Sequence, residues 1–174
     1  IGRDRKSIWE GLTRKETYGT SGDRILLWFD LIKEDKTYPM GSTTSLNVNP
    51  TFKVKAVGAF EQKDGCPDYS STNISEEEIS RICKNECYNP SDRRKNISRI
   101  EVVKITPQVI PNEKVEDLIV DVWKSFECKP SQEGCEIEFS DEAFENLSRD
   151  SIYYVRAIQE ASPVVNAGNL RCTY

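Results

Sequence analysis

Hydrophobic and polar positions follow two different periods along the chain. Near the N-terminus apolar residues recur at three- and four-residue spacing (Ile8, Trp9 and Leu12), which predicts one leading helix. Asp4 is placed to cap that helix, which we expect to end near Lys15. Beyond residue 24 the apolar positions follow the shorter period of strands, so most of the remaining chain is expected to form sheet.

Five to seven strands are predicted after the leading helix. The run from Arg24 to Ile32 is apolar and aromatic enough for a buried strand, whereas Glu34–Asn49 is polar and is interpreted as a loop. The predicted strands are Arg24–Ile32, Phe52–Gly58, Ile97–Val109, Val115–Trp123, Glu136–Phe139, Ser151–Glu160 and a further one starting in Leu170–Tyr174.

Residues 62–96 break the strand pattern and are interpreted as an insertion. They are polar and hold three of the six cysteines. Ser75 followed three residues later by Glu78 is a capping box, which predicts a short helix there. Ser140 is expected to cap a second short helix, with Ala143 on its apolar side.

The turn signals between the predicted strands favour an antiparallel arrangement. We therefore predict a mainly β (α+β) chain: an antiparallel, Ig-like β-sandwich with a leading helix and a helical insertion pinned by disulfides. Two parts are expected, residues 1–24 and residues 25–174, the second carrying the insertion at about 62–96.

Composition narrows the possible chemistry. The 174 residues carry a net charge of −5 and no basic tract, so nucleic acid is not an expected partner. No apolar run reaches the ~18 residues of a membrane span. The chain has no histidine, which excludes histidine-based triads and histidine zinc sites, and no metal or other cofactor is expected within it.

Six cysteines indicate an oxidising compartment, and hence a periplasmic or secreted protein. Cys83 and Cys87 are four apart on the predicted helix, where β-carbons lie about 5–6 Å apart, too far for a disulfide at ~3.8 Å. We predict Cys128 with Cys135, Cys66 with either Cys83 or Cys87, and the remaining helix cysteine with Cys172. A zinc site and free thiols are the alternatives, but the spacings do not match a zinc knuckle.

The segment Tyr18–Arg24 is the strongest candidate for a binding site. Its two glycines free the backbone, and Thr20 and Ser21 supply hydroxyl groups before Arg24. A turn of this kind can bind an anion, although it lacks the P-loop pattern. A tight connection between helix and strand is the alternative interpretation.

The same region carries a resemblance. Ser7–Leu12 and Arg14–Ile25 resemble the late segment of a large bacterial family of unknown function, related to the PHP (polymerase and histidinol phosphatase) metal-dependent hydrolases. The segments Tyr38–Gly41, Arg99–Lys104 and Tyr153–Ala157 resemble later parts of that family, in the same order. The insertion, with Glu86–Pro90, resembles a subset of it.

The resemblance implies that the metal ligands of the family belong to an upstream barrel, because this chain has no histidine. Residues 1–24 would be the last helix and turn of that barrel, and the rest an accessory β domain whose partner is the upstream region. Divalent metals are then expected only upstream, no catalytic residue is expected here, and Thr20, Ser21 and Arg24 would lie near the cleft of the whole protein. The chain is interpreted as a fragment that is inert by itself.

A stand-alone extracellular binding module that recognises a protein or glycan is the alternative. The hydrolase reading predicts an exposed apolar surface around Ile8, Trp9, Leu12 and Trp28, where the barrel would pack. The sequence leaves the substrate, the metal and the oligomeric state open.

Overall fold

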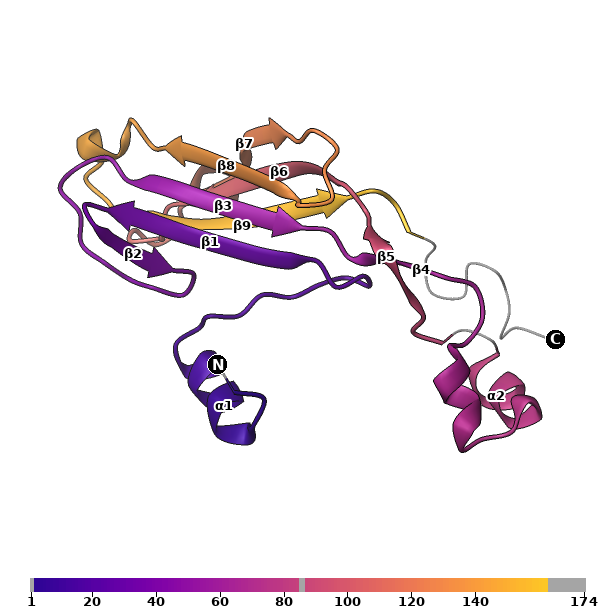
Figure 1. Cartoon of the computed structure of the whole chain (residues 1–174). Helices are drawn as coiled ribbons and strands as arrows, with labels where there is room; N and C mark the ends of the chain where they lie inside the picture. Colours follow the sequence, from indigo (N-terminus) through magenta and orange to yellow (C-terminus); the bar gives the residue numbers. More distant parts are fainter. Residues whose placement is uncertain (1, 85–86, 163–174) are drawn as a thin grey trace.

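Two antiparallel sheets face each other in the structure, a computed structural model that describes residues 2–84 and 87–162. A two-stranded ribbon extends from one end of this sandwich and carries the insertion (Figure 1). The prediction of a mainly β, sandwich-like chain with few helices is therefore confirmed.

The strands are ordered as follows across each sheet. The first sheet consists of β2 (Lys36–Pro39), β1 (Leu26–Lys33), β3 (Thr51–Val57) and β8 (Cys135–Ser140). The second sheet consists of β7 (Ile119–Glu127), β6 (Ile97–Ile105) and β9 (Ile152–Gln159). The ribbon pairs β4 (Phe60–Gln62) with β5 (Pro90–Arg94).

The core lies between the two sheets. Alternate residues of β3 point inward, among them Phe52 and Val54, and Ile100 and Val102 of β6 belong to the same buried cluster. The Phe52 ring lies 5.2 Å from the ring of Phe139 on β8, centroid to centroid. As the period-two pattern of these strands predicted, one face of each strand packs against the opposite sheet.

The leading helix α1 (Arg5–Thr13) stands apart from the sandwich (Figure 1). As predicted, Asp4 caps it, because the Asp4 carboxylate accepts a hydrogen bond from the backbone N–H of Ser7 at 3.0 Å. None of its residues is buried. Its apolar stripe is therefore largely exposed.

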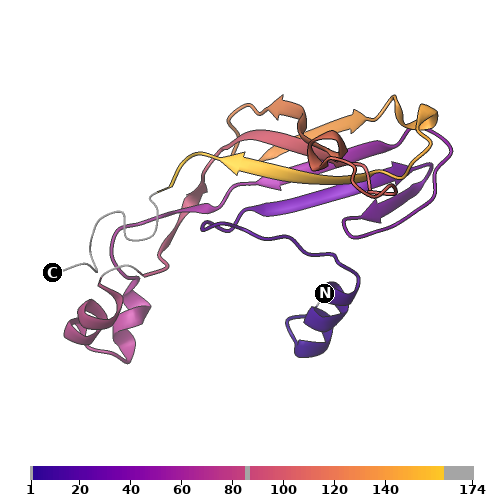
Figure 2. The same ribbon diagram turned by 180° about the vertical axis from the view of Figure 1, so that it is seen from behind.

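The insertion occupies the far end of the ribbon, as the reverse view shows (Figure 2). It contains a 3-10 helix, η1 (Asp68–Thr72), and the helix α2 (Glu76–Cys83). Ser75 caps α2 by accepting from the N–H of Glu78, as predicted. The helix ends sooner than expected, since Lys84 takes a left-handed conformation, and Cys87 lies beyond it.

Three local predictions were wrong. The segment predicted as loop contains β2, a short edge strand that ends at Pro39. The predicted strand from Val115 begins with a helical turn, α3 (Val115–Leu118), and β7 follows it. Ser140 ends β8 and caps nothing; instead Asp141 accepts from the N–H of Ala143 before the 3-10 helix η2 (Phe144–Asn146).

One further predicted strand is shorter than expected, and another lies outside the described residues. The strand predicted to reach Val109 ends at Ile105, where β6 ends. The strand predicted at Leu170–Tyr174 lies outside the described residues.

Candidate functional site

A hollow in the described part of the surface lies beside β9. It has a volume of about 700 Å³, within the usual ~300–1,000 Å³ of ligand sites. One wall is formed by the consecutive residues Tyr154–Ser162 of β9 and its end, and the other by residues between Thr17 and Leu27. The hollow therefore lies between one long strand and the turn that the sequence singled out.

The turn is held by its own residues. Gly22 has φ of +111°, a conformation that favours glycine over residues with a Cβ. The Tyr18 hydroxyl donates to the carbonyl oxygen of Ile25 across the turn at 3.1 Å, and the N–H of Ile25 donates to the carbonyl oxygen of Asp23. These contacts bend the chain from the segment after α1 into β1.

Asp23 fastens this turn to the opposite wall. Its Oδ2 atom accepts hydrogen bonds from Gln159 Nε2 at 2.7 Å and from the Ser162 hydroxyl at 2.6 Å, and pairs with Lys95 Nζ at 3.0 Å. Partial burial opposes the charge of Asp23, but these three donors outweigh it and keep the pKa of its carboxyl below the ordinary value. We call these three contacts of Asp23 the Asp23 latch. Its hydrogen bond to Gln159 joins segments more than 130 residues apart in sequence.

The three predicted residues of the turn separate in the structure. Thr20 and Ser21 line the hollow and are exposed, whereas Arg24 is exposed and does not line it. The hollow thus contains the predicted hydroxyl groups without the predicted guanidinium. The sequence did not reveal the contribution of β9 or of Asp23, because their proximity depends on the pairing of distant segments.

Every charge that lines the hollow already has a partner. The Arg156 guanidinium pairs with Glu101 and Asp121, at 2.9 and 2.7 Å. The Glu160 carboxylate accepts from the backbone and side-chain amides of Asn96. With Asp23 held by its latch, the lining offers hydroxyl groups, apolar surface and backbone groups, and no free charge for an ion.

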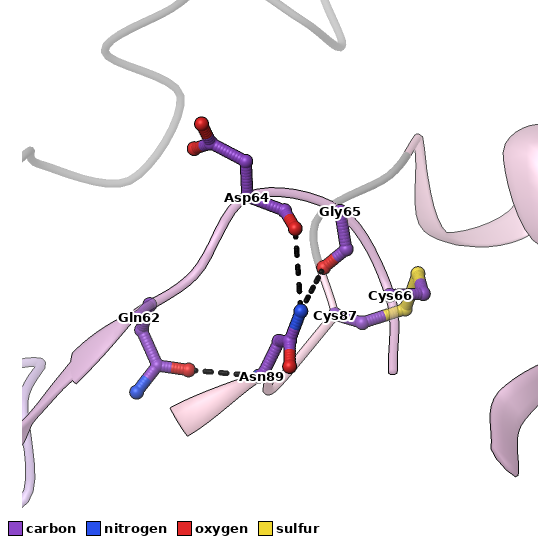
Figure 3. Close-up of a disulfide and its surroundings, with 6 residues drawn as sticks. All are labelled: Gln62, Asp64, Gly65, Cys66, Cys87 and Asn89. Atoms are coloured by element: carbon purple, nitrogen blue, oxygen red, sulfur yellow. Dashed lines mark hydrogen bonds between the residues drawn. A yellow bond between two sulfur atoms is a disulfide. The ribbon is translucent and has the colours of Figure 1, made fainter. Parts of the chain in front are cut away.

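A second feature is the closed base of the insertion (Figure 3). Cys66 is bonded to Cys87, with Cα atoms 4.8 Å apart, and this decides between the two predicted partners of Cys66. Beside the disulfide, the Asn89 side-chain amide donates to the carbonyl oxygens of Asp64 and Gly65, and the Asn89 N–H donates to Gln62 Oε1.

The other cysteines lie in separate places. Cys128 is bonded to Cys135 at the edge of the core, as predicted. Cys83 is half-buried and has no disulfide partner among the described residues. Its predicted partner, Cys172, lies outside them.

A third feature is a set of exposed apolar side chains on α1 and β1. The side chains of Ile8, Trp9 and Leu12 on α1 are 58%, 69% and 54% exposed. Trp28, on the outer face of β1, is 46% exposed. All four residues that were predicted to be exposed are so in the structure.

Neither metal ligands nor a membrane span emerges from the described residues. They contain no group of three or more His, Cys, Asp or Glu side chains able to hold a metal. Among their helices, none has the length and apolar character needed to cross a membrane. Comparison of the chain with protein-family models, curated proteins and solved structures finds no significant match.

Proposed function

We propose that this chain is the C-terminal accessory region of a periplasmic or secreted, PHP-like metal-dependent hydrolase and packs against the catalytic barrel of that protein. The resemblance of Arg14–Ile25 to the hydrolase-related family supports this assignment. The catalytic metals would then belong to the barrel, and the isolated chain is expected to be inert.

The exposure of α1 is the observation that carries the proposal. A nine-residue helix is too short to be stable alone in water, and its stability normally comes from packing its apolar face. Here the side chains of Ile8, Trp9 and Leu12 are each more than half exposed. A surface on another region of the protein would supply the missing contact.

The three tryptophans allow a direct test. Trp9 and Trp28 are exposed, whereas Trp123 is partly buried against the core. Hydroxyl-radical footprinting should modify Trp9 and Trp28 readily in this chain and much less in a longer protein that includes the upstream region. Trp123 is the internal control and should react equally in both. Equal modification of Trp9 in the two forms would contradict the proposal.

An assay tests the inert state separately. We expect no hydrolysis of p-nitrophenyl phosphate by the 174-residue chain in the presence of Mn²⁺ or Zn²⁺. Metal-dependent turnover by the purified chain would contradict the assignment of catalysis to another region.

One observation favours a second candidate, a stand-alone binding module for a protein or glycan. The disulfide-closed insertion projects from the sandwich, and α2 packs mainly against η1 rather than against the sheets (Figure 1). If footprinting shows α1 equally exposed in every form of the protein, this module becomes the better proposal, with the insertion as its recognition surface.

A further inference from the structure

The strand β9 is an edge that lacks the usual protection. It pairs with β6 on one side, and on its other side no described strand pairs with it. It is eight residues long, contains no proline or lysine, and its one charged residue is Arg156. Long edges of this kind are templates for pairing with another chain.

The remaining edges of the sandwich differ from β9 in this respect. The edge strand β2 is four residues long and contains Lys36 and Pro39. The edge strand β8 carries Glu136 and Glu138. The edge strand β7 is interrupted by an irregularity in its pairing, beside Val122 with φ of +55°. Each of these features discourages edge-to-edge pairing. The pairing of β9 is irregular only at its end, beside Ile97–Arg99 of β6, and the rest of its edge has none of these features.

The hollow lies along this unprotected edge. Its opposite wall includes Thr17–Ser21, whose backbone makes no hydrogen bond to the backbone of another described residue. Two rows of free backbone groups thus border one space, and the charged side chains between them are already paired. The complement of such a space is a chain that brings its own backbone N–H and C=O groups and no charge.

We infer that this hollow binds an extended, uncharged polypeptide segment, which adds to the second sheet as a strand beside β9. Main-chain hydrogen bonds supply the affinity. The hydroxyl groups of Thr20 and Ser21 and the apolar side chains of Ile25 and Leu27 contact its side chains. The inference does not depend on the proposed hydrolase role, because a strand can come from any partner protein.

Hydrogen exchange tests the inference on the whole chain. The probe is an uncharged peptide of alternating threonine and valine, about seven residues long to match β9. We expect it to slow amide exchange within Ile152–Gln159 and to leave exchange in β3 unchanged. The same peptide with alternate amides N-methylated, so that one edge lacks donors, should give no protection.

Two matched variants locate the effect. Thr20→Trp fills the hollow from an exposed position, whereas Thr43→Trp places the same side chain on an exposed loop that does not line it. We expect Thr20→Trp to weaken peptide binding by at least about tenfold and Thr43→Trp to leave it unchanged. Exchange in β3 reports whether each variant is folded.

Three results would overturn the inference. One is the absence of peptide protection in the folded wild-type chain. Another is equal protection by the N-methylated peptide, which would show that backbone pairing is not involved. The third is full protection of β9 in dilute protein before peptide is added, which would show that the chain covers this edge itself.

Discussion

Asp141 joins three elements at one end of the core. The residue is 1% exposed, and its carboxylate pairs with Lys104 Nζ and accepts from the Tyr153 hydroxyl at 2.5 Å. Burial opposes its ionisation, but these donors together lower the pKa of the Asp141 carboxyl. Burial and the same contact raise the pKa of the Tyr153 hydroxyl. Asp141 therefore fixes β6, β9 and the start of η2 relative to one another.

Replacing Asp141 should be costly. Asp141→Asn leaves the largely buried Lys104 ammonium without its counter-charge. We expect the free energy of unfolding, measured in urea, to fall by about 3–5 kcal/mol. Glu136→Gln is the control, because the Glu136–Lys53 pair is solvent-exposed, and should cost less than about 1 kcal/mol. A comparable small loss for Asp141→Asn would show that the buried pair contributes little.

Glu113 provides a pH-dependent contact. Its carboxylate accepts from Arg149 at 2.6 Å and from the backbone N–H groups of Ile110 and Val109, which together lower its pKa from 4.5 to about 2. A lowered pKa in the folded state means that the contribution to stability is complete above pH 4.5 and is lost as the pH falls toward 2.

The substitution Glu113→Gln should therefore flatten the pH dependence of stability in this range. We expect wild type and variant to differ most above pH 4.5 and to converge as the pH approaches 2, in urea titrations at a series of pH values. Glu116→Gln is the control, since Glu116 is exposed and no hydrogen bond or ion pair of its side chain is seen among the described residues. A constant difference across the range would contradict a role for Glu113 ionisation.

At the scale of elements, the two disulfides serve different parts of the molecule. Cys66–Cys87 closes the insertion, whose helix α2 makes few contacts outside it, whereas Cys128–Cys135 adjoins the core. A cross-link across 21 residues stabilises by about 3 kcal/mol in the chain-entropy model.

The double substitution of Cys66 and Cys87 by serine should accordingly unfold the insertion alone. Limited proteolysis is expected to cut within 68–83 while the sandwich retains its melting temperature. The matched double substitution of Cys128 and Cys135 should lower the melting temperature of the sandwich and spare the insertion. Loss of the sandwich in both variants would show that the two parts fold as one unit.

The sequence predicted elements best where one pattern dominated. β3 alternates from Phe52 to Ala56, so its core face was evident. Val115 and Leu118, by contrast, suit a helical turn as well as a strand, and the turn α3 was missed. β2 was missed because an edge strand needs few apolar residues and tolerates Pro39. Hydrophobic periodicity indicates which residues face the core. The short elements α3 and β2 contribute little to the core, so their periodicity is weak.

The candidate site likewise has parts that the sequence predicted and parts that it did not. Thr20 and Ser21 were recognisable from the local density of glycine and hydroxyl groups. The edge of β9 and the latch at Asp23 were not, because they exist only once the second sheet has formed and Gln159 lies opposite the turn. The chemical groups of one turn can be predicted from its own sequence. A hollow between segments as distant as this turn and β9 can be predicted only once the topology of the sheets is known.

At the scale of the whole molecule, the pairing of the cysteines indicates the cellular compartment in which the protein folds. Two disulfides in the described residues are compatible with an extracellular or periplasmic protein. Of six cysteines, these bonds leave Cys83 and Cys172. We predict that the native protein, folded in an oxidising compartment, joins these two and holds three disulfides.

Thiol labelling measures this count. Denatured without reduction, protein exported to the periplasm should show no cysteine labelled by iodoacetamide, and after reduction all six should be labelled. Cys83→Ser should leave one labelled cysteine before reduction, which peptide mapping would identify as Cys172. Two labelled cysteines in the unreduced wild type would show instead that Cys83 and Cys172 are free thiols.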